Sequence, residues 1–207
     1  MAITYPILYP SSLVGISQFT LRARSAVQRT ESPFTFADQV QVGAGQQWQC
    51  DVSIPIVNRD KAEEVNAFLL KLNGRQGTFL LGDPNAENPR GSVSTTITVN
   101  GNEQTGNELN VSGFASSTVD VMKAGDYIQL GSLSTARLYK VLNNVVSDAS
   151  GNATLDIWPN IRISPVDGDT VTYTSAVGQW RLAENTQQFT IQNGSVYQVN
   201  FTALEPL

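Results

Sequence analysis

The side chains that could carry out chemistry are few in this chain and of a restricted kind. It has 207 residues, among them 18 Asp and Glu, a single Cys and no His. Serine and cysteine nucleophiles usually depend on a His base, and most zinc and non-haem iron sites use His ligands. Those mechanisms therefore lose their commonest component, and chemistry based on carboxylates is the enzymatic possibility that remains.

The carboxylates form no recognisable pair of the kind that glycoside hydrolysis needs. Glu63 and Glu64 fall in a helical pattern, where neighbours in sequence do not face one another. Asp167 and Asp169 resemble the start of a calcium loop, but a Gly stands where its bidentate Glu belongs. We expect a turn at residues 165–168, and we predict no catalytic, cofactor-binding or metal-binding residues; a carboxylate-only glycosidase stays as a rival.

Cys50 lies in residues 48–54, where every second residue is apolar, as a strand with one buried face requires. No basic neighbour in sequence would lower the pKa of its thiol, so we predict a small core residue and not a reactive cysteine. A single Cys also excludes an internal disulfide, a CxxC redox motif and a thiolate zinc site. We expect the Gly-Ala-Gly at residues 43–45 to form a turn before this strand.

Four aromatic residues could form a stacking platform for a sugar or a base, namely Trp158, Trp180, Tyr139 and Tyr173. Packing in the core is the alternative, and we favour it. Trp158 shares its face of a predicted strand with the polar Asp156, so we expect it to be partly exposed. A carbohydrate-binding role therefore stays open at this point.

The balance of charge disfavours nucleic-acid binding, because 13 Lys and Arg stand against 18 acidic residues and the net charge is −5. Only Arg22, Arg24 and Arg29 come close together in sequence, and Glu31 follows them. The chain has no stretch of about 18 apolar residues, which a membrane-spanning helix would need. Residues 1–10 have no basic segment and contain two Pro, so we predict an extended arm and not a signal peptide.

Alternation of apolar and polar residues predicts strands at residues 19–24 and 48–54, and helical spacing predicts one helix between residues 60 and 73. Asp60 is the expected N-cap, Glu63 completes a capping box, and the Asn-Gly at residues 73–74 ends the helix. The apolar positions that should face a sheet are Ala62, Val65, Phe68, Leu69 and Leu72. We therefore predict a helix that lies on a sheet.

The segment after this helix has a different character. Residues 85–92 are polar and contain Pro and Gly, as linkers often do, and the next eighty or so residues read as short strands between turns. The predicted strands are residues 95–99, 109–111, 127–130, 137–141, 154–158 and 171–174. Six strands of this length suit a small barrel or sandwich.

The last alternating segment, near residues 196–203, has the same pattern as residues 48–54, and we predict that it returns to the first sheet. The predicted fold is mainly β. It has an N-terminal β-sandwich-like domain with one α-helix, residues 1–84 with 176–207, and an inserted all-β domain, residues 85–175, similar to an OB barrel. The inserted segment carries most of the negative charge, with five basic and nine acidic residues.

Two segments carry a resemblance to a known family. Residues 60–84 read DKAEEVNAFLLKLNGRQGTFLLGDP, and residues 197–205 read YQVNFTALE. Together with the strand-rich N-terminal part and the second all-β domain, they resemble the distal tail (Dit-like) proteins of long-tailed, siphovirus-type bacteriophages and of related gene transfer agents. The resemblance covers most of the chain and rests on architecture, because this family has no catalytic signature.

The resemblance implies a structural virion protein with no enzymatic activity and no cofactor. It implies a homohexameric ring at the distal end of the tail that joins the tail tube to the baseplate hub and to tail fibre proteins, with roles in host attachment and genome ejection. Such a protein would be made in the cytoplasm of the bacterial host, and would neither bind nucleic acid specifically nor insert into a membrane. The alternative is a carbohydrate-binding module or minor tail protein that contacts the host surface.

Overall fold

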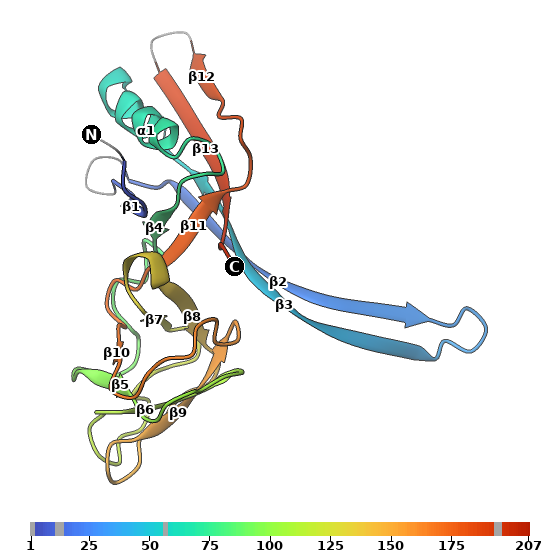
Figure 1. Ribbon diagram of the computed structural model, residues 1–207, viewed down its shortest axis with the longest axis vertical. Helices are drawn as coiled ribbons and strands as arrows, with labels where there is room; N and C mark the ends of the chain where they lie inside the picture. Colours follow the sequence, from blue (N-terminus) through green and yellow to red (C-terminus); the bar gives the residue numbers. More distant parts are fainter. Residues whose placement is uncertain (1–2, 11–14, 56–57, 193–195) are drawn as a thin grey trace.

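The computed structural model describes residues 3–10, 15–55, 58–192 and 196–207. Within these residues the chain forms one α-helix and two β-sheets, so the mainly β fold class predicted from the sequence is confirmed. Figure 1 shows the helix beside the larger sheet, the smaller sheet below it, and one long hairpin that projects away from both.

The larger sheet combines strands from both ends of the chain, in the spatial order β1-β4-β11-β13-β3-β2, with β12 also paired to β13. Strand β13 pairs antiparallel with β3, from Asn200 opposite Ser53 to Leu204 opposite Gln49, which confirms that the last segment returns to the first sheet. The strands are β1 (Ile7–Leu8), β2 (Gln18–Glu31), β3 (Asp38–Ser53), β4 (Phe79–Leu81), β11 (Gly178–Leu182), β12 (Phe189–Gln192) and β13 (Val196–Leu204).

The smaller sheet is entirely antiparallel, in the order β10-β5-β6-β9-β8-β7, and an additional bridge between Gln129 and Thr172 brings its two ends together. The small barrel expected from six short strands is therefore nearly closed. Its strands are β5 (Ile97–Val99), β6 (Glu108–Ser112), β7 (Tyr127–Leu130), β8 (Arg137–Val141), β9 (Ala153–Trp158) and β10 (Thr170–Val171), with a single 3-10 turn, η1 (Leu133–Thr135).

The boundaries predicted for an inserted domain fall between β4 and β5 and between β10 and β11. Each sheet has its own cluster of buried side chains, but the two meet closely. Tyr127 and Leu138 belong to strands of the small barrel and are nevertheless buried in the core of the larger sheet. The division into two domains stays a prediction, and the contact between the two sheets is a packed one.

Helix α1 (Arg59–Lys71) begins one position before the residue that the sequence predicted as its cap. The N-cap is Asn58, whose side-chain oxygen accepts a hydrogen bond from the backbone N–H of Lys61, so the prediction of Asp60 was wrong. Asp60 lies in the first turn, where its charge complements the helix dipole. The helix ends as predicted, because Asn73 and Gly74 both take positive φ.

The helix packs its apolar face into the core of the larger sheet. All five apolar residues predicted for this face are buried, and Leu69 is 1% exposed while its neighbour Leu70 is 63% exposed. Cys50 lies in the same core with no exposed surface, and burial raises the pKa of its thiol well above the ordinary value. The interpretation of Cys50 as a core residue is confirmed. At 13 residues, α1 is too short to cross a membrane.

The N-terminal segment folds back on its own chain and does not project as an arm. The backbone N–H of Ile7 donates to the carbonyl of Thr78, and that of Tyr9 donates to Leu80, which aligns β1 parallel with β4. The Tyr9 side chain is buried in the core, and burial raises its pKa to about 12. The extended segment predicted at residues 1–10 therefore lies on the body of its own chain, in the residues that are described, and is not a free arm.

We expect Leu69→Asp to prevent stable folding, because it places an unpaired carboxylate in a fully buried site, at a cost of about 4 kcal/mol or more. Leu70→Asp is the matched control, since this adjacent side chain is mostly exposed. Urea denaturation followed by circular dichroism measures both. A cooperative transition near that of the wild type for Leu69→Asp would contradict the placement of this helix face.

Candidate functional site

The most distinctive feature of the molecule is the outer part of the hairpin formed by β2 and β3, residues 25–46, which we call the arm. It projects from the body as a two-stranded ribbon (Figure 1), and nearly all of its residues are exposed. Strand β2 pairs only with β3, and the pairing of β13 with β3 stops at Gln49. Within the described residues, both edges of the arm therefore lack a neighbouring strand.

The two faces of the arm differ in chemistry. Cross-strand partners share a face, and the pairs Val27–Val42 and Arg29–Val40 lie on the side that is continuous with the core face of β2. We call this side the valine face; Val27, Val40 and Val42 are between 53% and 75% exposed on it. The opposite side is polar and uncharged, and consists of Gln28, Thr30, Gln39 and Gln41.

Charge on the arm is confined to its outer end. Arg29 donates to Asp38 through Nε at 2.8 Å and to Glu31 through Nη2. All three side chains are on the valine face, because Glu31 pairs directly with Asp38 and Arg29 is two residues away along β2. The three Arg residues that are close in sequence therefore form no basic cluster, since Arg22 pairs with Asp51 at the other end of the hairpin.

The tip of the arm is a six-residue turn, residues 32–37, closed by a hydrogen bond from the Ser32 N–H to the Ala37 carbonyl. It presents two aromatic side chains to solvent, with Phe34 91% and Phe36 76% exposed. Exposed Phe residues on a projecting loop are unusual in a monomer and are typical of contact surfaces.

The glycines predicted as a turn lie inside β3 instead. The register of the hairpin shifts between Ser25 and Val27, opposite residues 43–45. A Cβ on Gly43 would approach the Ala26 carbonyl to 3.0 Å, and one on Gly45 would approach the Ala26 Cβ equally closely. The two glycines therefore permit a β-bulge at which the arm leaves the body, and the chain reverses at residues 32–37.

The root of the arm is fixed by Trp48, which lies on β3 where the strand enters the core. Its ring packs edge-on against Trp158 with centroids 4.2 Å apart, and its Nε1 donates to the Leu138 carbonyl at 2.9 Å. On the backbone, the Trp48 N–H donates to the Glu205 carboxylate, and the Glu205 N–H donates to the Trp48 carbonyl. One residue thus joins the arm, the small barrel and the C-terminal segment.

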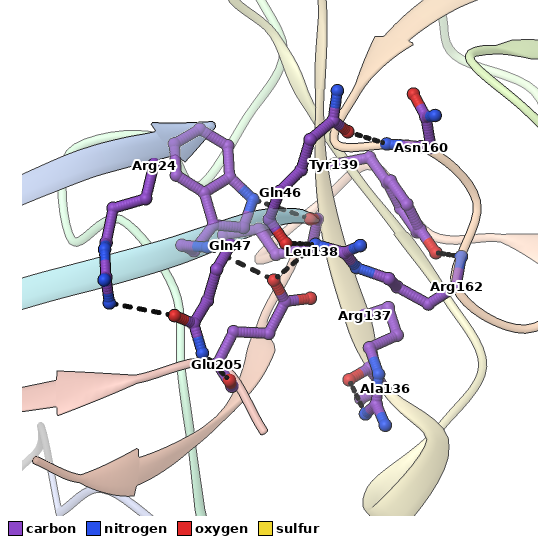
Figure 2. Close-up of polar contacts among 11 residues, drawn as sticks. Arg24, Gln46, Gln47, Ala136, Arg137, Leu138, Tyr139, Asn160, Arg162 and Glu205 are labelled. Carbon is purple, nitrogen blue, oxygen red and sulfur yellow. Dashed lines mark hydrogen bonds and ion pairs between the residues drawn. The ribbon is translucent and has the colours of Figure 1, made fainter. Parts of the chain in front are cut away.

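The two preceding residues of β3 are held in the same way, as Figure 2 shows. The carbonyl of Gln46 accepts a hydrogen bond from Arg162, and its side-chain oxygen accepts one from the Asn160 N–H at 2.7 Å. Gln47 donates from its side-chain nitrogen to the Glu205 carbonyl at 2.9 Å. The arm is therefore anchored by three consecutive residues, which restricts its angle to the body.

A buried ion pair completes this junction. Nη2 of Arg162 lies 3.3 Å from Oε2 of Glu205, and the side chains are only 15% and 4% exposed. The Arg162 N–H also donates to the Tyr139 hydroxyl, whose pKa is raised by burial. Arg162 Nε and Glu205 Oε1 have no hydrogen-bond partner within the described residues, so each member of the pair depends strongly on the other.

The aromatic platform that the sequence left open is not assembled. Trp180 and Tyr139 are buried, in the cores of different sheets. Trp158 is half-buried against Trp48, and the Tyr173 hydroxyl donates to the Thr95 carbonyl. These four residues therefore do not form a stacking surface for a sugar.

The acidic motifs have structural roles. Asp169 accepts a hydrogen bond from the Val166 N–H in the expected turn before β10. Asp148 accepts from the N–H groups of Asn152 and Ser150, and these bonds lower its pKa. Among the residues that the structure describes, no group of three or more His, Cys, Asp and Glu side chains is arranged to hold a metal ion.

No family model matches the chain, and no curated protein matches it significantly. The arm was also missed by the sequence analysis. Its sequence signal was weak, since residues 39–42 alternate after the Ser-Pro at residues 32–33, whereas residues 25–31 do not alternate. Alternation predicts a strand but does not predict that the strand leaves the body, so the exposure of Ala23 and the arm valines could not be inferred.

We expect Arg162→Met to lower the free energy of unfolding by about 3 kcal/mol or more, because it leaves the Glu205 carboxylate buried without a counter-charge. The double variant Arg162→Met with Glu205→Gln should lose less than the sum of the two single losses, since both charges are removed together. Urea denaturation gives these values. Arg59→Met, at an exposed helix position, is the control, and an equal effect there would contradict the role of the pair.

Proposed function

We propose that this chain is a structural protein of a phage tail tip that works by self-assembly. It forms a hexameric ring that connects the tail tube to the baseplate hub and to the receptor-binding apparatus, and it has no enzymatic activity. The observation that carries this proposal is the arm, an anchored ribbon that has, within the described part of the chain, two unpaired edges and an uncovered apolar face.

Leaving such a ribbon exposed to water is unfavourable. A two-stranded hairpin is marginally stable by itself, and a long exposed edge is a template for pairing with another strand. A protein that anchors the ribbon through Gln46, Gln47 and Trp48, and gives it an apolar face, is built to contact something beyond its own body.

The resemblance of residues 60–84 and 197–205 to distal tail proteins supports the choice of a ring over other assemblies. A ring made of heterologous contacts closes by rotation and uses projecting elements to bridge neighbouring subunits. The net charge of −5 and the isolated positions of the Arg side chains also suit a ring whose lumen DNA must cross without binding.

We expect the purified protein to have a native mass six times the 22.4 kDa of one chain, and to show rings with sixfold symmetry. Light scattering on a sizing column, followed by negative-stain images of the same peak, makes both measurements. Deletion of residues 26–44 should yield a protein that still folds, because the core of the body lies outside this segment. Without the arm, its native mass should be lower than that of six chains. A full-length protein without rings would count against the proposal.

A further inference from the structure

The free edges of the arm belong to opposite sides of one ribbon. Among the residues that the structure describes, the outer edge of β2 has no neighbouring strand along residues 18–31, and the edge of β3 has none from residue 38 to the junction. A second copy of the chain offers the same two edges. Addition of its β3 to the first copy's β2 would leave one free edge at each end, so that the contact can repeat from copy to copy.

The valine face requires a consistent orientation in such a sheet. In the body the same face of the hairpin carries Cys50 and Val52 and is covered by the core, and in the arm it is open. If the arms add side by side with their valine faces on one side, odd-numbered residues of β2 must lie opposite even-numbered residues of β3. The allowed registers then differ from one another by two residues or a multiple of two.

Charge favours a shifted register over the hairpin's own. Repetition of the register within one hairpin would place Glu31 opposite Asp38 of the second copy, and like charges directly opposite are destabilising. A shift of two residues places Arg29 opposite that Asp38 and Val27 opposite Val40 of the second copy. Within its own chain Arg29 binds carboxylates through Nε and Nη2, which leaves Nη1 for a further one.

We propose that a second copy of this chain binds edge to edge through the arm, with its β3 antiparallel to β2 of the first copy, Arg29 opposite its Asp38 and Val27 opposite its Val40. This inference rests on the proposed function and specifies the contact between subunits. Each copy adds a stagger of two residues, and closure of a sheet into a ring of strands requires a stagger of this kind. Closure pairs both edges of every arm.

Complementation between two charge variants tests this pairing. Arg29→Glu copies place Glu opposite Asp when alone, and Asp38→Arg copies place Arg opposite Arg, so neither variant should assemble. In an equimolar mixture every contact between unlike copies joins opposite charges. We expect light scattering to show a full-sized assembly in the mixture and at least a tenfold weaker association of each variant alone.

The mixture is decisive because the ion pair within each chain is broken in both variants and cannot be restored by mixing. Arg59→Glu, an exposed helix position with a similar change of charge, should assemble normally. Single arm variants that assemble like the wild type, or a mixture that stays dissociated, would overturn the pairing. In the first case the ring assembles without this pairing, so the proposed function would stand while this inference fails.

A cysteine crosslink checks the register independently. Directly opposite residues in an antiparallel pair have Cβ atoms about 4.5–5.5 Å apart, close enough for a disulfide after a small adjustment. Val27→Cys copies mixed with Val40→Cys copies should therefore form a disulfide-linked dimer under mild oxidation, while Cys50 is buried and does not compete. Val27→Cys with Gln41→Cys places the thiols on opposite faces and should not crosslink. Equal crosslinking of both pairs would overturn the proposal. So would the absence of crosslinking in the Val27→Cys and Val40→Cys mixture, together with a wild type that stays monomeric at high concentration.

Discussion

The structure depends on Trp48, where a single strand passes from the protein core to an exposed ribbon. Its ring fills the contact between the two sheets beside Trp158, and its backbone is clamped by Glu205 near the end of the chain. Burial of a large aromatic ring with its N–H satisfied is favourable, and it fixes both partners in orientation. The arm, the small barrel and the C-terminal segment therefore share one anchor.

This anchor explains how a hairpin whose two edges have no neighbouring strand in the described part of the chain can be held in position. On the body side of Trp48, β3 lies between β2 and β13 and contributes Cys50 and Val52 to the core. On the other side, Gly43 and Gly45 allow a bulge, and the ribbon continues with its apolar face uncovered. The buried pair of Arg162 and Glu205 holds the small barrel against the root, so a partner on the arm would be placed at a defined angle to the rest of the subunit.

Most elements of the fold could be predicted from local pattern. The strands Tyr127–Leu130 and Arg137–Val141 begin and end where the turn residues around them predicted, and the buried face of the helix was predicted correctly. The helix cap was misplaced because Asn58 and Asp60 can both accept from a backbone N–H, and only the geometry of the preceding chain selects one. The candidate site was missed, because alternating residues give no measure of what covers a strand.

The sequence by itself determined the class of fold and the absence of histidine-based chemistry, since both follow from composition and from periods of two and 3.6 residues. Tertiary structure decided which strands share a core. The alternating residues of β3 are the same kind of pattern on either side of Trp48, yet Val52 is buried and Val42 is exposed. The physical reason is that burial depends on contacts made by distant segments, here Phe201 opposite Val52 and the Glu205 clamp, which no local pattern specifies.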